Sequence, residues 1–331
     1  FTLTFPAIPG SSTGTTYARF RLSTDDAGLL ATGAASDGEV EDYTFTITTP
    51  STGVVKSQVK ISNDLGGLAA GTLDVADEFG SAVASLGDLD GDGVADIAVG
   101  ARRDENTDTE EGAVYVLLMN SDGTVKSQVK ISDGLGGLTA GSLGPSDKFG
   151  AAVAGLGDLD GDGVPDMAVG AFGTVGNSGG SEGAVYVLLL NSDGTVKSQQ
   201  RINDSVGGLT PSLEGGDLFG TGVAGLGDLD GDGVPDMAVG AQGDENGDFS
   251  EGAVYVLMMN SDGTVKSQVK ISDGLGGLAA DSLDAGDNFG SAVATIGDLD
   301  GDGVTDLAVG AQRDGNTVNA QGAVYVLLMN S

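Results

Sequence analysis

Four aspartate-rich segments carry the residues best suited to chemistry, each reading D-L-D-G-D-G-V-x-D. Carboxylates stand at positions 1, 3, 5 and 9, glycine at position 6 permits a tight turn, and the valine carbonyl at position 7 can point inward. Four carboxylates so close repel one another unless a cation lies among them, and flexible oxygen ligation favours Ca²⁺ over Mg²⁺. We therefore predict about four Ca²⁺ ions with a structural role; the alternative is an acidic turn without metal. The expected ligands are Asp88, Asp90, Asp92, Val94 and Asp96; Asp158, Asp160, Asp162, Val164 and Asp166; Asp228, Asp230, Asp232, Val234 and Asp236; and Asp298, Asp300, Asp302, Val304 and Asp306.

The composition excludes several classes of protein. The 331 residues include 49 acidic and 14 basic side chains, a net charge of −35, and no Cys, His or Trp. Disulfides, thiol nucleophiles, imidazole bases and the usual zinc or copper sites are therefore excluded. The strong negative charge argues against binding of nucleic acid or of an anionic membrane surface. No apolar run is long enough for a transmembrane helix, and we expect no membrane insertion.

The aspartate segments recur within a longer repeat. A Phe-Gly pair starts each unit, and successive pairs are 70 residues apart. In the first unit, four apolar or alternating segments are separated by the aspartate loop, a variable loop and an Asn-Ser-Asp-Gly turn, with no helical pattern between them. Four strands per unit, repeated four times, predict an all-β chain folded as a four-bladed β-propeller. The first unit's expected strands are 79–85, 97–101, 113–119 and 125–132, and the units start near Phe79, Phe149, Phe219 and Phe289.

The lysine residues indicate the order of strands within a blade. Eight of the 14 basic residues lie on the last segment of the units, and lysine commonly protects an exposed sheet edge. That strand is therefore predicted to be outermost, and the Ala/Gly-rich strand after the Phe-Gly pair innermost. The array begins with a lone lysine-bearing segment, 54–62, and its last unit lacks one. We predict that strand 54–62 completes the fourth blade and closes the ring; the alternative is four units of a longer array or a larger ring.

Together these motifs resemble the FG-GAP repeats of integrin α-subunit propellers and of many bacterial secreted proteins. The resemblance covers roughly residues 51–331, and in the first unit it rests on Phe79-Gly80, the loop 88–96, and the segments 99–101 and 112–116. Two features depart from the family: the proline of its Gly-Ala-Pro is replaced in all four units, and the family usually makes seven blades. The resemblance implies extracellular, calcium-stabilised propellers that serve in adhesion and recognition, and it implies no enzyme.

The first fifty residues differ in composition from the repeats. Segments 17–22 and 43–47 are expected to be strands. The stretch 37–45 resembles the closing motif of the GEVED domain, a small β-sandwich of bacterial surface proteins. Fifty residues are few for that domain, so we expect only its C-terminal part in a processed or truncated chain. The predicted domains are a partial GEVED-like β segment over 1–48, a linker over 49–53, and the propeller over 54–331.

Strand parity separates the loops onto two faces of the propeller. The aspartate loops and the Asn-Ser-Asp-Gly turns share one face and hardly vary between units. The loops between second and third strands share the other face and vary strongly. Variable loops on a rigid scaffold are a candidate recognition surface, although unconstrained surface loops are the plainer interpretation. These loops are 102–111, 172–182, 242–251 and 312–321.

The motifs lead to two functional hypotheses. The first is a non-enzymatic, calcium-stabilised, secreted β-propeller module for adhesion or recognition at a bacterial cell surface, where it binds a protein or a glycan. The alternative is a structural subunit of a self-assembling extracellular fibre, stalk or surface layer. In that case, a neighbouring copy of the chain completes the N-terminal β segment.

Overall fold

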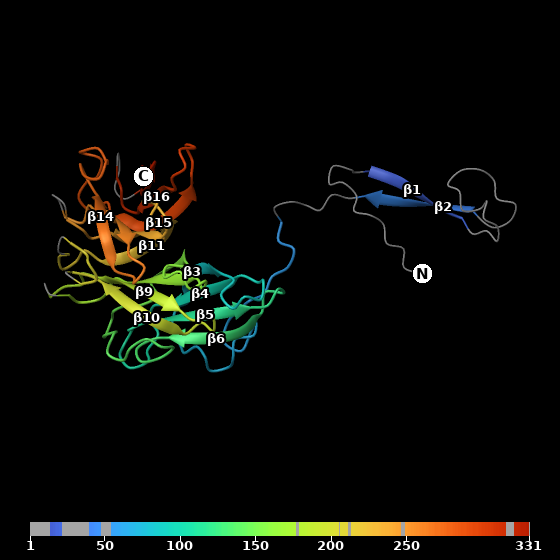
Figure 1. Cartoon of the computed structure of the whole chain (residues 1–331), viewed down its shortest axis with the longest axis horizontal. Helices are drawn as coiled ribbons and strands as arrows, with labels where there is room; N and C mark the ends of the chain where they lie inside the picture. Colours follow the sequence, from blue (N-terminus) through green and yellow to red (C-terminus); the bar gives the residue numbers. More distant parts are fainter. Residues whose placement is uncertain are drawn as a thin grey trace. The chain divides into compact units, whose positions relative to one another are not determined.

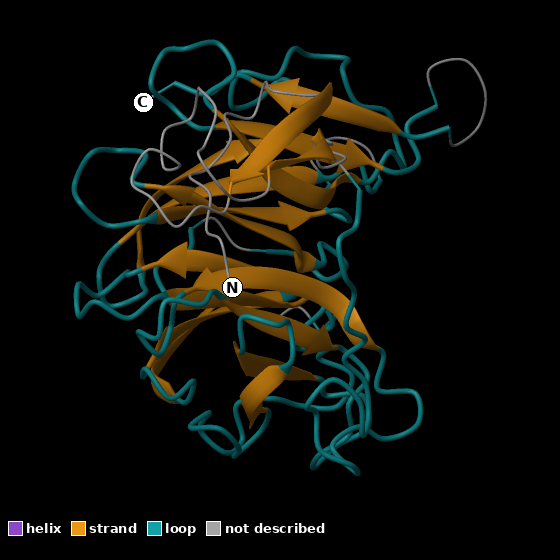
Figure 2. Cartoon of the chain, turned by 90° about the vertical axis from the view of Figure 1, so that its right-hand side faces the viewer, coloured by secondary structure: helices purple, strands orange, loops and turns teal. Residues whose placement is uncertain are grey.

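The computed structural model shows strands and loops, and the described residues contain no helix (Figure 2). It describes residues 14–21, 40–47, 54–176, 179–204, 206–210, 213–245, 249–315 and 321–330. These residues therefore include no helix that could cross a membrane. The chain divides into two compact units, Phe1–Gln58 and Val59–Ser331, and each is described by itself.

The first unit contains a two-stranded antiparallel sheet. Strands β1 (Gly14–Arg21) and β2 (Val40–Ile47) pair along their whole length, from Gly14 opposite Ile47 to Arg21 opposite Val40. Both strands expected here are therefore present, with slightly different ends. The GEVED resemblance stays a prediction, and the expected linker over 49–53 lies outside the described residues.

The second unit is a four-bladed β-propeller built from antiparallel sheets (Figure 1). Within a blade, the strands follow sequence order from the centre outward. The Ala/Gly-rich inner strands of consecutive blades pack side by side, and the lysine-bearing strands are outermost in the first three blades. This order confirms the prediction. The blades are β3 (Phe79–Gly87), β4 (Asp96–Ala101), β5 (Ala113–Met119) and β6 (Val125–Ile131); β7 (Ala152–Gly157), β8 (Asp166–Ala171), β9 (Ala184–Leu190) and β10 (Val196–Ile202); β11 (Phe219–Gly227), β12 (Asp236–Ala241), β13 (Ala253–Met259) and β14 (Val265–Ile271); and β15 (Phe289–Gly297), β16 (Asp306–Ala311) and β17 (Ala323–Leu327).

The core lies between blades and explains the Phe-Gly pair. Every residue of β9 is buried, because this strand is covered on both faces. Phe149 is fully buried and meets the Tyr186 ring edge-on, with 5.4 Å between ring centroids. The next residue, Gly150, has a positive φ of 86°, and a Cβ there would lie 2.3 Å from the Ala113 carbonyl oxygen. Phenylalanine thus fills the core, while glycine lets neighbouring blades approach closely.

The predicted closure of the ring by strand 54–62 is wrong. Residues 54–61 form no strand, and within the described residues the fourth blade consists of β15, β16 and β17. Within the described part of the chain, β3 and β15 do not pack together as the other neighbouring inner strands do. The physical reason lies in the loop after this segment: the Val125 N–H donates to the Gly66 carbonyl, which holds the loop against the first blade. The same bond joins the loops at Gly136 and Gly207 to Val196 and Val265 of the blades that follow them, so the loop at Gly66 takes the equivalent position one blade before the first.

Candidate metal centre

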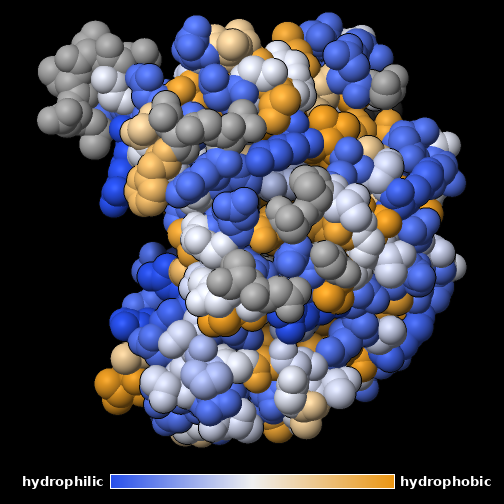
Figure 3. All heavy atoms as spheres, turned by 90° about the vertical axis from the view of Figure 1, so that its left-hand side faces the viewer, coloured by the Kyte–Doolittle hydropathy of each residue, from blue (hydrophilic) through white to orange (hydrophobic). Residues whose placement is uncertain are grey.

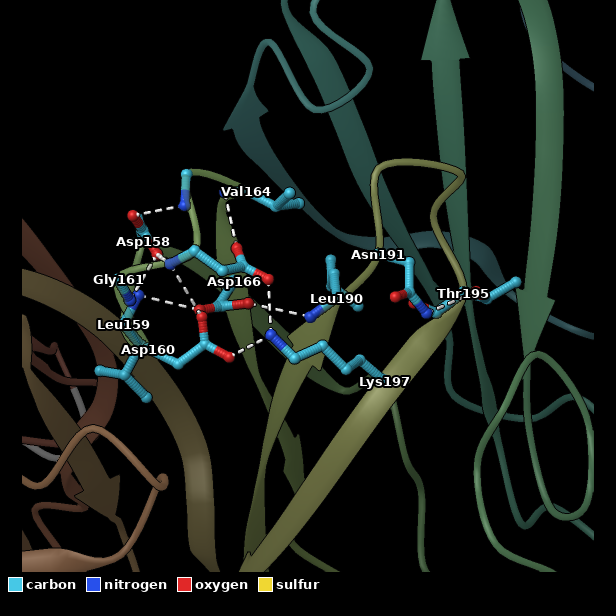
Figure 4. Close-up of polar contacts among 12 residues, drawn as sticks. Asp158, Leu159, Asp160, Gly161, Val164, Asp166, Leu190, Asn191, Thr195 and Lys197 are labelled. Carbon is cyan, nitrogen blue, oxygen red and sulfur yellow. Dashed lines mark hydrogen bonds and ion pairs between the residues drawn. The ribbon is translucent and has the colours of Figure 1, made fainter.

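Each aspartate loop connects the inner strand of a blade to the second strand, and the second blade shows its construction (Figure 4). The Asp158 carboxylate accepts hydrogen bonds from the backbone N–H groups of Gly161, Asp162 and Gly163, at 2.8 to 3.0 Å. Gly161 and Gly163 have φ values of 77° and 89°, which glycine adopts without strain. The first aspartate therefore organises the turn that brings the later carboxylates together.

The last aspartate of the loop ties two strands together. Both oxygens of Asp166 accept backbone N–H groups, from Leu159 at 2.8 Å and from Leu190 at 2.9 Å (Figure 4). The same pair of bonds recurs in every blade. Burial raises the pKa of Asp166 to about 6, whereas the two backbone hydrogen bonds lower the pKa of its counterpart in the fourth blade, Asp306.

Carboxylate oxygens converge in all four loops. In each loop, three carboxylates each offer one oxygen, and these three oxygens lie within 4.8 Å of one another. Calcium binds oxygen at 2.3–2.6 Å, so two ligands of one ion lie up to about 5 Å apart, and the spacing fits. In the first three blades the cluster unites loop positions 1, 3 and 9; in the fourth it unites positions 1, 3 and 5. The converging residues are Asp88, Asp90 and Asp96; Asp158, Asp160 and Asp166; Asp228, Asp230 and Asp236; and Asp298, Asp300 and Asp302.

The remaining predicted ligands are not among the three converging carboxylates of their loops. In the first three blades, the position-5 aspartates Asp92, Asp162 and Asp232 accept the N–H of the valine at position 7. In the fourth blade Asp306, at position 9, is instead outside the cluster of three. Metal ligation by the valine carbonyls stays a prediction.

A lysine from the outermost strand contacts the loop in each of the first three blades, and sequence reasoning missed this role. Lys197 Nζ lies 2.5 Å from the Oδ2 atoms of both Asp160 and Asp162 (Figure 4). Lys126 and Lys266 make the same double contact in their blades. The Lys197 ammonium lowers the pKa of Asp162 below its usual range. The loop thus already accommodates one positive charge, and the recurrence of lysine 34 to 37 residues after these aspartates was the signal for it.

A second ion pair lies under the variable loops, at the opposite end of the blade. Lys130 Nζ is 2.6 Å from Oδ1 of Asp104, a carboxylate that is almost fully buried, and the Tyr115 hydroxyl donates to its Oδ2 at 2.9 Å. Lys270, Asp244 and Tyr255 repeat the arrangement in the third blade. In the first and third blades, both lysines of the outermost strand therefore pair with acidic groups of their own blade.

Comparison with known proteins agrees with this architecture. The FG-GAP repeat model matches residues 79–117 and 289–327, and an FG-GAP-like repeat model matches residues 158–239. Integrin alpha-4 of Xenopus laevis is 34% identical over 187 residues, which are 56% of this chain and 16% of the relative. Integrin alpha-E of Homo sapiens is 35% identical over 170 residues, 50% of this chain and 13% of the relative. Integrin alpha-5 of Xenopus laevis is 47% identical over 95 residues, 29% of this chain and 8% of the relative.

The family models place the similarity within the repeats of the second unit. The chain spans less than a fifth of the length of these relatives. The matched residues include the Phe-Gly pairs of the first, third and fourth blades and the aspartate loops of all four blades. The chain thus carries FG-GAP repeats, and its second unit is an integrin-like FG-GAP β-propeller.

Proposed function

We propose that this protein is a non-enzymatic β-propeller module, stabilised by calcium, that serves in adhesion or recognition at a bacterial cell surface. The observation that carries the proposal is the convergence of three carboxylate oxygens in each of four equivalent loops. The resemblance to integrin α-subunit propellers supports an extracellular, secreted location and a protein or glycan as the partner. The absence of cysteine is consistent with a secreted protein in which calcium takes the stabilising role of disulfides.

Calcium acts in this proposal on the stability of the fold. An ion that binds the folded loops and not the unfolded chain adds about 2.7 kcal/mol per site at a concentration 100 times its Kd. The loops join the inner strand to the second strand, and their last aspartate also reaches the end of the third. An ion held there therefore stabilises three strands of the blade at once.

Calorimetric titration of the chelator-treated chain with Ca²⁺ tests the proposal. We expect four sites in the wild type and three in Asp158→Asn, which removes one converging carboxylate. The control is Asp193→Asn, in the turn at the same end of the same blade, which should keep four sites. The melting temperature should rise with calcium in parallel. An unchanged melting temperature in the presence of EDTA would refute the calcium proposal.

The variable loops supply the proposed recognition surface. They follow the second strand of each blade and lie at the end opposite the aspartate loops. Phe249, in the third of these loops, is 73% exposed, whereas Phe172 in the second is half-buried. An exposed aromatic ring is a common contact for proteins and sugars. Screening against arrays of glycans and cell-surface proteins tests this surface: binding that survives Phe249→Ala and replacement of the variable loops would exclude it.

A structural subunit of a fibre, stalk or surface layer is the second candidate function. It is favoured by the near-identity of the four repeats, which present similar surfaces on successive blades. The sheet β1–β2, which has two strands in the described residues, offers unpaired edges in the first unit. Electron microscopy with and without calcium distinguishes the candidates, because only the second predicts polymers.

A further inference from the structure

The lysine–aspartate pairs under the variable loops are more deeply buried than the pairs at the aspartate loops. The Asp104 side chain is 1% exposed and the Lys130 side chain 28% exposed; the values for Asp244 and Lys270 are 2% and 22%. In both blades the lysine Nζ lies 2.6 Å from Oδ1 of the aspartate. The partners are 26 residues apart in each blade, and the outer strand carries the lysine directly opposite the blade's tyrosine. The fold thus removes an amine and a carboxyl group from most of the water and holds them in contact.

The two oxygens of the buried carboxylate have different surroundings. Oδ2 of Asp104 accepts the Tyr115 hydroxyl at 2.9 Å, and Oδ2 of Asp244 accepts the Tyr255 hydroxyl at 2.8 Å. Oδ1 of both aspartates accepts no hydrogen bond from the described residues, although the lysine Nζ is in contact with it. The contact therefore lacks the directional geometry of a hydrogen bond. Because a C–O bond is short, Nζ lies no farther than about 3.8 Å from the carboxyl carbon Cγ, within 1 Å of the separation at which such atoms react.

A second carboxylic acid lies beside each pair. The N–H of Arg103 donates to the Asp77 carbonyl at 3.2 Å, and the N–H of Gly243 donates to the Asp217 carbonyl at 3.0 Å, so each second acid lies next to the turn that carries the paired aspartate. Burial raises the pKa of Asp77, and it raises the pKa of Asp217 to about 6. In both blades the paired aspartate adds to this rise and the lysine opposes it. An acid of this kind can accept and release a proton near neutral pH.

We propose that the lysine and the aspartate of each pair condense to an amide, an isopeptide bond within the blade. The bond joins Nζ of Lys130 to Cγ of Asp104 in the first blade. In the third blade it joins Nζ of Lys270 to Cγ of Asp244. The outermost strand is then attached covalently to the turn that follows the second strand, and the structure shows both pairs before the reaction. The bond depends neither on calcium nor on a recognition ligand, and it gives a chain without cysteine a covalent cross-link.

The reaction needs no oxidant and no cofactor, because an ammonium group and a carboxylate give one amide and one water. A proton first passes from Nζ to Oδ1, which removes two charges from a poorly hydrated site and leaves a neutral amine and a neutral acid. The amine then attacks Cγ and the N–C bond forms, while the tyrosine hydroxyl stabilises the negative charge that develops on Oδ2. The second acid takes another proton from the nitrogen and delivers it to Oδ1, the Cγ–Oδ1 bond breaks, and water leaves.

The tyrosine is suited to this role because it keeps its proton. Burial, together with the charge of the paired aspartate, raises the pKa of both Tyr115 and Tyr255. Each hydroxyl therefore remains a hydrogen-bond donor to the oxygen that becomes the amide carbonyl. Exclusion of water from the site also slows hydrolysis of the bond once it has formed.

The second blade carries neither reacting group at this place. Thr174 replaces the aspartate, and Arg201, opposite Tyr186, replaces the lysine, so both partners change together. A hydroxyl and a guanidinium cannot form this amide. The lysines at the aspartate loops differ in another way: Lys197 forms hydrogen bonds with two carboxylates, and its side chain is 37% exposed. Water and regular hydrogen bonds keep such a pair ionised, so we expect the bond in the first and third blades and at neither of these other places.

Mass spectrometry of the intact folded chain tests the proposal, because each bond removes one water, about 18 Da. After incubation near neutral pH, the wild type should fall short of its calculated mass by two waters. Lys130→Arg should fall short by one water, and Lys130→Arg/Lys270→Arg by none. Arginine keeps the positive charge beside the buried aspartate, so these variants are expected to fold. The control is Lys197→Arg, which changes an exposed pair and should still lose two waters.

Each outcome of this experiment decides the proposal. Fragmentation of the digested wild type should identify two branched peptides, one joining residues 104 and 130 and the other joining 244 and 270. A wild type that keeps its full calculated mass overturns the proposal. A loss of water that persists in Lys130→Arg/Lys270→Arg also overturns it, because that loss comes from a succinimide at an Asp-Gly pair and involves no lysine. Unfolding measurements that depend on the free Asp244 carboxylate are made in the Lys270→Arg background, where the bond cannot form.

Discussion

The Phe-Gly pair allows the contact between blades to be measured directly. Gly150 and Gly80 occupy the same position in consecutive units and have φ values of 86° and 94°. A Cβ on Gly150 would lie 2.3 Å from the Ala113 carbonyl oxygen, whereas a Cβ on Gly80 would meet nothing within 4 Å. Gly150→Ala and Gly80→Ala therefore share the backbone strain and differ in the clash with a preceding blade.

The magnitudes follow from these two contributions. Placing alanine at positive φ costs roughly 1–2 kcal/mol in either variant. Overpacking adds about 1–3 kcal/mol at Gly150. A contact of 2.3 Å with a backbone oxygen is relieved only by moving a strand, so the upper part of this range applies. We expect Gly150→Ala to lower the free energy of unfolding by about 2–3 kcal/mol more than Gly80→Ala does.

Urea unfolding, followed by tyrosine fluorescence and far-ultraviolet circular dichroism, measures this difference. The chain contains six tyrosines and no tryptophan, so tyrosine is the intrinsic probe. The measurement is made in EDTA and at low protein concentration, so that neither calcium nor a second copy contributes. Equal losses in the two variants would refute the inference that glycine is required at Gly150 by contact between blades.

Two further predictions concern buried polar groups. Tyr255 donates its hydroxyl to the buried Asp244 carboxylate at 2.8 Å, whereas the Tyr186 hydroxyl donates to a neutral backbone carbonyl. Tyr255→Phe should therefore lower the free energy of unfolding by about 2–3 kcal/mol, and Tyr186→Phe by about 1 kcal/mol. Equal losses in urea unfolding would contradict this prediction. Burial raises the pKa of Asp217 from 3.8 to about 6, and the nearby Asp244 carboxylate adds to this shift. The contribution of this group to the free energy of unfolding is therefore greatest below pH 4 and falls as the pH rises through about 6. The free energy of unfolding of Asp217→Asn, relative to that of the wild type, should therefore rise by about 3 kcal/mol between pH 4 and pH 8 in EDTA. A difference between the two proteins that does not change with pH would argue against this prediction.

The strands and the acidic loops were predictable because their signals are local. Alternation along 125–132, the apolar run 113–119 and the turn between them specify a hairpin within twenty residues. The four-fold recurrence of the unit then indicated a propeller, and the structure confirms the strand order. The convergence of Asp158, Asp160 and Asp166 follows from their spacing around one tight turn.

The roles of the lysines could not be derived in the same way. Lys197 and Asp160 are 37 residues apart, and they meet because the outer strand of a blade runs back past the aspartate loop. From the sequence, the lysine was interpreted only as protection for an exposed edge. Contact between them depends on the register of three strand pairings, which alternation alone does not specify.

The sequence by itself determined the all-β class, the four units, the order of strands from centre to edge and the acidic loops, since each depends on short-range periodicity or on repetition. Only the tertiary structure decided that, within the described residues, β3 and β15 do not pack together as the other neighbouring inner strands do. That outcome depends on long-range packing between blades, as where Gly150 lies close to the Ala113 carbonyl of the preceding blade. A pattern of near-identical repeats carries no measure of this packing, so the segment 54–62 matches the outer strands in sequence and residues 54–61 nevertheless form no strand. Figure 3 shows the resulting surface, on which polar and apolar residues are interspersed.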